Sequence, residues 1–365
     1  MSICRLLCCC GLLAAAQFAA RDGVAQDREV SLEERQPLAI SGFAVGVGSY
    51  DRNRRENTFT GSKLALSLFR PWSDQLYLFG QLTTHVALDD SGVPHTDIEI
   101  DNLIVNWTPP GASALTLSFG RFDAPIGYER DDEPLTLIPT TSFNFEFARP
   151  VKFTGLMARY SVSPHVALLG LVANGWDVEL DNNSGKTGGV RVMVFPASGV
   201  ALAAGALYGP EEDGTNGSQR TLWSGDVTLQ PLPQLVVQAE ANRGLQRNAG
   251  GGANLAWMAA VGTVFWRATG SVGISVRGEV LDDADGARTG TPQTLRSLTI
   301  SPWYFYREAQ EGVFSNVEFT TFRLPAFSLR PAVRFDRSDQ PFFEDRNGAL
   351  KRSNLTAVVE LVYLF

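Results

Sequence analysis

The sequence predicts an all-β fold, a transmembrane antiparallel up-and-down β-barrel of about sixteen strands with short periplasmic turns and long extracellular loops. Three observations predict it. The chain ends in an amphipathic strand, Leu361–Phe365, whose last residue is aromatic. Segments of alternating apolar and polar residues recur, separated by breaks that are short and long in turn. Past the N-terminus, no apolar run reaches the roughly 18 residues that a membrane-spanning helix needs.

Composition narrows the class further. The chain has 365 residues, 35 of them glycine, and a mean hydropathy of -0.04, which suits one large barrel better than a helical membrane protein. Its net charge of -8 is dispersed, so no basic tract suggests a nucleic-acid partner. All four cysteines lie at positions 4 to 10. A mature chain without them would have no disulfide scaffold, thiol nucleophile or cysteine metal site.

The N-terminus has the pattern of a secretory signal peptide, predicted over residues 1–25. Arg5 supplies a weak positive region, Leu6 to Ala16 a short apolar region, and Gly23 and Ala25 a small-residue cleavage site. Ala16 marks an alternative cleavage site. Residues 26–37 are polar and predict a flexible periplasmic N-terminus, and residues 38–365 are assigned to the outer-membrane barrel.

Each expected strand has the 9–11 or more residues that a tilted transmembrane strand needs. In 75–88, for example, Leu76, Leu78 and Leu82 alternate with Tyr77 and Gln81. An even strand number places both termini on the periplasmic side. The expected strands are 38–49, 60–70, 75–88, 98–108, 115–126, 152–162, 166–177, 187–196, 199–209, 220–230, 235–246, 254–267, 272–282, 313–324, 327–337 and 353–365.

The breaks between these strands fall into two alternating kinds. Tight turns rich in proline or glycine are expected at 71–74, 109–111, 163–164, 196–198, 231–233, 269–271 and 324–326. Longer polar loops are expected at 50–59, 89–97, 127–151, 178–186, 210–219, 247–253, 283–312 and 338–352. Tryptophans near the strand ends suggest two interfacial belts: Trp72, Trp107 and Trp266 on the periplasmic side, and Trp176, Trp223 and Trp257 on the outer side.

The last strand is expected to close the barrel by pairing with the strand that begins near Leu38. Tyr363 and Phe365 lie on its expected lipid face and resemble the assembly signal of outer-membrane proteins. The expected partners therefore include outer-membrane lipids, periplasmic chaperones and the barrel-assembly machinery.

The segment from Gly120 to Glu129 reads Gly-Arg-Phe-Asp-Ala-Pro-Ile-Gly-Tyr-Glu and resembles the strand-to-loop segment of the β-barrel porin type 2 (OmpL-like) family. The resemblance continues at Thr154-Gly155, Asn174-Gly175-Trp176-Asp177 and Arg277-Gly278-Glu279, and then at Arg330, Arg334 and Asp336. It spans most of the chain and implies a bacterial outer-membrane porin. Segment 287–312 is longer than the usual family loop. Trimers are common among sixteen-stranded porins, so a homotrimer is one candidate assembly, although no interface signature is visible.

A barrel of this size leaves an aqueous lumen, so function would depend on lumen-facing charges and on any loop that narrows the pore. Loop 127–151 is the best candidate for a constriction, because its apolar residues would prefer burial; lying over the rim or against another subunit is the alternative. Its acidic start suggests a cation preference. The predicted pore-lining residues are Arg121, Asp123, Glu129, Asp131, Asp132, Glu133, Arg159, Arg191, Asp226, Glu240, Arg277, Glu279, Glu318, Arg330, Arg334, Asp336 and Glu360.

Other chemistries are weaker. The runs Asp181–Asn183 and Asp282–Gly286 could offer oxygen ligands to a cation, but a solvated loop explains each better. Three histidines and no Gly-x-Ser-x-Gly segment argue against a hydrolase. The expected function is a porin for passive diffusion of small hydrophilic solutes or ions, without cofactor or metal. A plugged structural or adhesive barrel is the main alternative, and an outer-membrane hydrolase a weaker one.

Overall fold

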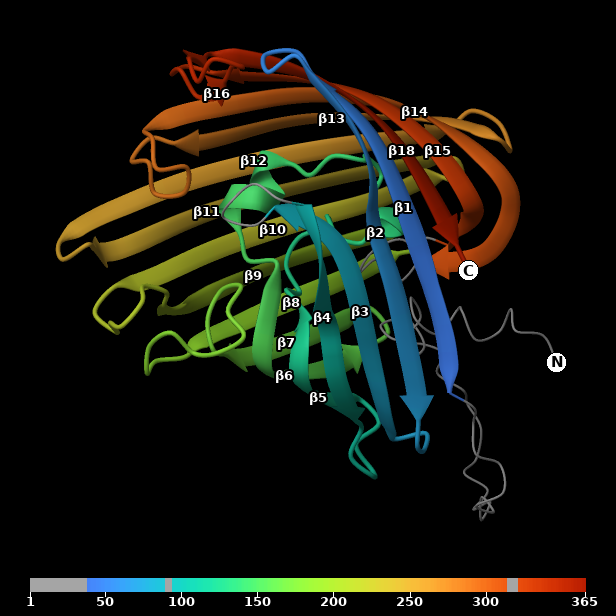
Figure 1. Cartoon of the computed structure of the whole chain (residues 1–365). Coiled ribbons are helices and arrows are strands. Elements are labelled where there is room, and N and C mark those ends of the chain that lie inside the picture. The colour runs from blue at the N-terminus through green and yellow to red at the C-terminus, as the bar shows by residue number, and fades with distance from the viewer. Residues whose placement is uncertain (1–37, 89–93, 314–320) are drawn as a thin grey trace.

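The computed structural model describes residues 38–88, 94–313 and 321–365 and forms a closed antiparallel barrel (Figure 1). The predicted signal peptide, the predicted periplasmic segment 26–37 and Glu318 lie outside these residues. Sixteen strands make up the barrel, so the predicted fold class is confirmed. No helix among the described residues is long and apolar enough to cross a membrane.

Neighbouring strands pair in sequence order, and β18 closes the barrel on β1. The barrel strands are β1 (Ala39–Asp51), β2 (Glu56–Pro71), β3 (Leu76–Leu88), β4 (Pro94–Trp107), β5 (Leu115–Asp123), β6 (Lys152–Ser163), β7 (Val166–Ala173), β8 (Thr187–Ala197), β9 (Val200–Pro210), β10 (Gln219–Leu232), β11 (Leu235–Ala249), β12 (Ala253–Arg267), β13 (Val272–Asp283), β14 (Gln293–Val313), β15 (Thr321–Ser338) and β18 (Ser353–Leu364). Outside the barrel sheet lie a small hairpin, β16 (Phe343–Glu344) and β17 (Leu350–Lys351), and two short helical segments, η1 (Glu133–Leu135) and η2 (Asn144–Ala148).

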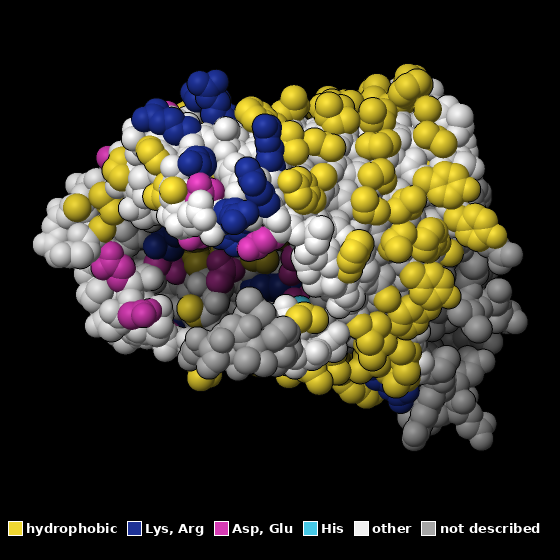
Figure 2. All heavy atoms as spheres, turned by 45° about the horizontal axis from the view of Figure 1, so that its top comes forward, with side chains coloured by type: hydrophobic (Ala, Val, Ile, Leu, Met, Phe, Trp, Pro, Cys, Tyr) yellow, Lys and Arg dark blue, Asp and Glu magenta, His cyan; other side chains and the backbone are white. Residues whose placement is uncertain are grey.

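Alternation along each strand separates a membrane face from a lumen face. In β18, Glu360 is 1% exposed and its neighbour Leu361 is 42% exposed. Figure 2 shows hydrophobic side chains covering the barrel wall, beside a hollow in which basic and acidic side chains lie together. The tight turns use the expected chemistry: Gly199, between β8 and β9, has a φ of 73°, a conformation that L side chains rarely adopt.

One expected loop and one expected turn are wrong. Segment 283–312, expected as an outer loop, contains β14, and the turn expected at 324–326 lies within β15, while most of the strand expected at 313–324 lies outside the described residues. Pro325 pairs with Glu308 inside the β14–β15 ladder, at a register irregularity. Since proline lacks an N–H, it interrupts a strand ladder at one position without ending the strand.

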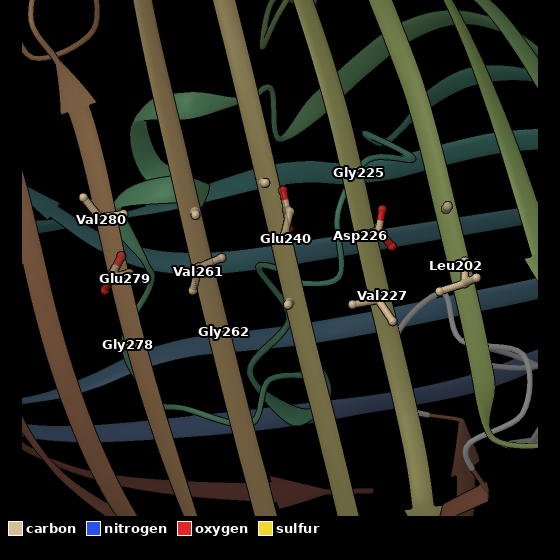
Figure 3. Close-up of a pocket in the computed structure, with 14 residues that line it drawn as sticks. Leu202, Gly225, Asp226, Val227, Glu240, Val261, Gly262, Gly278, Glu279 and Val280 are labelled. Carbon is tan, nitrogen blue, oxygen red and sulfur yellow. The ribbon is translucent and has the colours of Figure 1, made fainter.

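The wall formed by β9 to β13 has a shallow depression of about 820 Å³. Half of the residues that line it are glycine or alanine (Figure 3). Gly225, Ala241 and Gly278 alternate with the lumen-facing Asp226, Glu240 and Glu279. The small residues therefore lie on the membrane face.

We expect deletion of Phe365 to impair barrel closure. Its backbone exchanges two hydrogen bonds with Gly42 of β1, at 2.9 and 3.0 Å, and its ring stacks on Tyr363 at 6.1 Å between centroids. Deletion removes both of these hydrogen bonds from the pairing of β1 with β18, which closes the barrel. Heat-modifiable migration on gels measures the folded fraction, and Phe365→Tyr is the control that keeps the backbone and the ring. Normal migration of the deleted protein would contradict this role.

Candidate functional site in the lumen

The connection between β5 and β6 folds into the barrel and contacts the opposite wall. We call residues 124–151 the lumenal segment. Figure 1 shows it inside the ring of strands, with η2 facing β11 and β12. Its base is narrow, since the Ala124 N–H donates to the Val151 carbonyl at 2.7 Å. Its far side reaches β12, where the Tyr128 hydroxyl lies 2.9 Å from the Thr263 hydroxyl, and β14, where the Trp303 indole donates to the Leu137 carbonyl at 3.2 Å.

Apolar burial explains why this segment turns inward. Pro134 lies buried in the first turn of η1, and the π-helical turn η2 packs against β11, β12 and β13. A loop over the rim would leave these apolar side chains in water at a cost of roughly 1.5–3 kcal/mol each. Those that are buried in the lumen are Ile126, Tyr128, Leu137, Ile138, Phe143 and Phe145.

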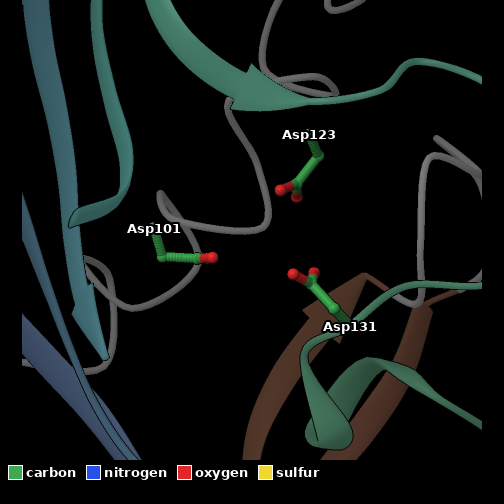
Figure 4. Close-up of side chains that lie close together, drawn as sticks. All are labelled: Asp101, Asp123 and Asp131. Carbon is green, nitrogen blue, oxygen red and sulfur yellow. The ribbon is translucent and has the colours of Figure 1, made fainter. Parts of the chain in front are cut away.

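On the side of β4 and β6, three carboxylates surround the ammonium group of Lys152. Its Nζ lies 2.8 Å from Asp101 and 3.0 Å from Asp131, and it also contacts Asp123. Figure 4 shows the three aspartates pointing toward one another from separate segments. Their nearest oxygens lie within 4.8 Å of one another, a spacing that could suit a metal ion. The Lys152 ammonium contacts all three carboxylates and neutralises one of their three negative charges.

Asp101 reaches this cluster through a β-bulge. Gln81 of β3 pairs with Asn102, but the next residue, Leu82, pairs with Ile100, which leaves Asp101 as an extra residue. Both Asp101 and Asn102 are consequently buried on the lumen side. The Asn102 side-chain N–H donates to the Gln81 side-chain oxygen at 3.0 Å. The Asn102 side-chain oxygen accepts a hydrogen bond from the Asp123 backbone N–H at 3.1 Å.

A second ammonium group, that of Lys63 on β2, binds the next two residues of the lumenal segment. It lies 3.5 Å from Asp132 and 3.3 Å from Glu133, and Gln81 donates to Asp132 at 3.1 Å. Burial, assisted by the charge of Asp131, raises the pKa of Asp132 to about 7 despite Lys63. For Asp131, burial acts in the same direction, but Lys152 and Lys63 outweigh it and lower its pKa.

Arginines hold the opposite side of the lumenal segment. Arg277 of β13 contacts Glu129 at 3.1 Å and donates to the Thr141 carbonyl at 2.9 Å. Arg330 of β15 donates to the Thr136 carbonyl at 2.7 Å and to Glu360 at 2.5 Å. These bonds tie loop carbonyls to guanidinium groups of the wall. Arg277 lies nearly across the barrel from Lys152, whereas Arg330 lies three strands from Lys63.

Three further arginine–carboxylate pairs complete the charged network. Arg334 donates to Asp336 at 2.7 Å and lies 3.5 Å from Glu279. Arg149, at the end of the lumenal segment, lies 3.0 Å from Glu240, and Arg191 contacts Asp226 at 2.6 Å. These three arginines face four carboxylates, of which Glu279 is shared with Arg277 at 3.4 Å.

Other predicted residues lie elsewhere. Arg121 pairs with Glu99 and approaches Glu179 to 3.9 Å, whereas Asp123 binds Lys152. Arg159 is half-buried on β6, opposite Thr116. Sequence reasoning missed Lys63, Lys152 and Asp101. Strand alternation could have found Lys63, but a bulge such as that at Asp101 has no visible signature here.

Two of the tryptophans assigned to the outer belt are buried inside the barrel, so that part of the belt prediction is wrong. Trp176 and Trp257 meet edge-to-face at 6.3 Å, and the Trp257 indole donates to the Ala148 carbonyl at 3.0 Å. Arg220 and Arg288 each lie over both rings, within 4.8–5.9 Å of the centroids. A tryptophan can lie inside the barrel when its indole N–H has a hydrogen-bond acceptor there. Trp223, by contrast, is 48% exposed and lies on the membrane face.

The two loop runs considered as cation ligands have internal partners. Asp181 pairs with Lys186, and the Asn182 amide donates to Asp213 at 2.5 Å. Asp283 accepts the backbone N–H groups of Arg288 and Thr289 at 3.0 and 2.7 Å. These contacts order the loops.

Fold and lumen together define an outer-membrane channel protein, a closed sixteen-strand barrel narrowed by an internal segment. The profile of one family, described as "Putative beta-barrel porin-2, OmpL-like", matches residues 74–365. The chain belongs to this family, which confirms the predicted resemblance and places the protein in the bacterial outer membrane.

Solved structures of similar fold are outer-membrane proteins. An anion-selective porin from Comamonas acidovorans is 8% identical with a TM-score of 0.62, and covers 90% of this chain and 99% of its own. The channel DcaP of Acinetobacter baumannii is 10% identical with a TM-score of 0.61, at 90% and 97% coverage. OmpT of Vibrio cholerae, in a trimer form, is 9% identical with a TM-score of 0.59, at 90% and 99% coverage. Among curated proteins no match is found.

Proposed function

We propose that the barrel is a water-filled channel for passive diffusion of small hydrophilic solutes or ions, and that the lumenal segment sets its constriction. The observation that supports this proposal most directly is the attachment of the segment at points around the lumen. Lys63 of β2 and Lys152 of β6 hold its acidic start, and Arg330 of β15 and Arg277 of β13 hold its middle, with β13 nearly across the barrel from β6. A segment held at both sides of a lumen can narrow it reproducibly.

The proposed constriction favours cations. Around the two lysines lie five carboxylates, so this part of the lumen carries excess negative charge; they are Asp101, Asp123, Asp131, Asp132 and Glu133. On the wall that carries the arginines, positive and negative charges nearly cancel. That wall therefore adds little to the cation preference. Farther out on β4, Asp97 and Glu99 are 48% and 43% exposed in their side chains and would attract cations toward the constriction.

A plugged structural barrel is the second candidate. It is favoured by the burial of most of the lumenal segment, including Glu129, Arg130 and Arg149. We propose no enzymatic role. The described histidine nearest a carboxylate, His85, lies 3.8 Å from Asp97, but a nucleophile elbow is absent from the sequence.

We further propose a homotrimer that contacts outer-membrane lipids, chaperones and the barrel-assembly machinery during its assembly. The trimer form of the OmpT barrel of Vibrio cholerae, which shares the fold, supports this assembly. Crosslinking of the purified protein, followed by mass measurement, tests it.

The test of the channel proposal is electrical. Purified full-length protein in a planar bilayer should give discrete conductance steps, and a salt gradient should give a reversal potential of the sign that cations produce. Absence of steps from heat-modifiable, folded protein would favour the plugged structural barrel. A reversal potential of the opposite sign would contradict the cation preference alone.

We expect the cation preference to fall as the pH is lowered from about 8 to about 6. Asp132, whose pKa is raised to about 7, is mostly ionised at the upper limit and mostly protonated at the lower. Asp131 keeps its charge over this range, because Lys152 and Lys63 lower its pKa. Reversal potentials of the wild type and of Asp132→Asn measure the effect: the variant should change less with pH. An equal change in both would assign the effect to groups other than Asp132.

A further inference from the structure

Two arginines face each other across β14 and β15 on the outside of the barrel. Arg296 and Arg337 are register partners, and both are exposed. Each arginine lies two residues from an exposed apolar residue of its own strand and therefore on the same face. These apolar residues are Leu298 and Phe335, which are 49% and 47% exposed. The arginine side chains therefore extend from the membrane face of the wall and away from the lumen.

Their depth corresponds to the outer interface of the membrane. Along β14 the outward residues from Tyr306 to Leu298 are apolar or aromatic, with Tyr306 and Leu298 53% and 49% exposed. Eight steps of about 3.3 Å along a strand tilted by about 40° span about 20 Å, close to the apolar band of such barrels. Arg296 lies one rung beyond this band, toward the outer loop 284–292. Figure 2 shows basic side chains gathered where the hydrophobic belt of the wall ends.

Within the part of the chain that the structure describes, no carboxylate forms an ion pair with either arginine. Like charges directly opposite each other on one sheet face are destabilising. The neighbouring carboxylates of Asp282 and Asp339 both accept hydrogen bonds from Thr294. The bond from the Thr294 backbone N–H to Asp339 measures 2.8 Å.

We infer that Arg296 and Arg337 bind the phosphate of an anionic membrane lipid in the outer leaflet. Two guanidinium groups on adjacent strands offer parallel N–H donors to the oxygens of one phosphate, which also cancels their repulsion. The acyl chains of that lipid would lie along Leu298 and Phe335, directly below. A free phosphate would gain the charge contacts but none of this apolar contact.

The test uses full-length protein in detergent, with phosphatidic acid and phosphatidylcholine of identical acyl chains as probes and native mass spectrometry as readout. The wild type should retain phosphatidic acid preferentially. Arg296→Gln/Arg337→Gln should lose at least about tenfold of that preference, as expected when charge-assisted hydrogen bonds are removed. Arg296→Lys/Arg337→Lys should keep part of it. The matched control is Arg243→Gln, because Arg243 is exposed on the outward face of β11 between Trp223 and Met258 and has no cationic partner across the strands.

Two results would overturn the inference. Unchanged lipid retention by the double glutamine variant would assign the phosphate elsewhere. Complete displacement of phosphatidic acid by an equal concentration of inorganic phosphate would make the site one for free anions. Heat-modifiable migration verifies that each variant is folded. The result does not depend on conduction through the lumen, so this inference and the proposed channel function can fail separately.

Discussion

Neutralising the acidic start of the lumenal segment is expected to move the channel's selectivity toward anions, by about threefold or more in the cation-to-anion permeability ratio. At pH 8, where Asp132 is mostly ionised, the variant Asp131→Asn/Asp132→Asn/Glu133→Gln removes about three negative charges. It also frees the ammonium of Lys63, which binds Asp132 and Glu133 at 3.5 and 3.3 Å. Both consequences act in the same direction. Lys152 keeps Asp101 and Asp123 as partners, so its side chain should stay in place.

Reversal potentials in a salt gradient measure this effect, and a charge-matched variant provides its control. Glu212→Gln/Asp213→Asn/Glu344→Gln removes the same formal charge from outer loops, away from the lumenal segment. It should change selectivity little, because exposed charges beyond about 8 Å are screened at physiological salt. An unchanged ratio in the lumenal triple variant would show that solutes do not pass this cluster.

The barrel was predictable because each transmembrane strand repeats the same requirement. Lipid on one side and charge on the other impose a period of two, and this placed Glu240, Arg277 and Arg330 correctly on the lumen face. The sequence does not predict β14, because Pro325 suggests a tight turn at 324–326 and residues 283–312 are assigned to a long loop. In the barrel, Pro302 pairs with Ile274, where one missing N–H interrupts the ladder without ending it.

The partners of the lumenal charges could not be predicted, because they depend on how a 28-residue connection folds in three dimensions. Alternation says that Arg277 faces inward but not that it meets Glu129, which lies 148 positions away in sequence. The bulge at Asp101 is similarly invisible, since one extra residue in a strand leaves no compositional mark. Trp257 was misplaced because an amphipathic ring suits an interface as well as an interior with an acceptor.

Removing the lumenal segment is expected to raise single-channel conductance severalfold. Ala124 and Val151 already share a backbone hydrogen bond, and Asp123 pairs with Lys152 in the β5–β6 ladder. An Asn-Gly pair in place of residues 125–150 would therefore close the hairpin as a two-residue turn. The barrel wall stays intact, and the ion pair of Arg330 with Glu360, which lies entirely within the wall, should persist in the open lumen.

Three outcomes separate the possible roles of the lumenal segment. A severalfold rise in conductance with folded, heat-modifiable protein would identify it as the constriction. Unchanged conductance would mean that solutes bypass it, for instance along β1 to β4. The control replaces residues 212–217 of an outer loop by Asn-Gly, which shortens the chain at the rim between the ends of β9 and β10 and should leave conductance unaltered. If steps appear only after removal of the lumenal segment, the native barrel is closed, and the structural alternative gains over the channel.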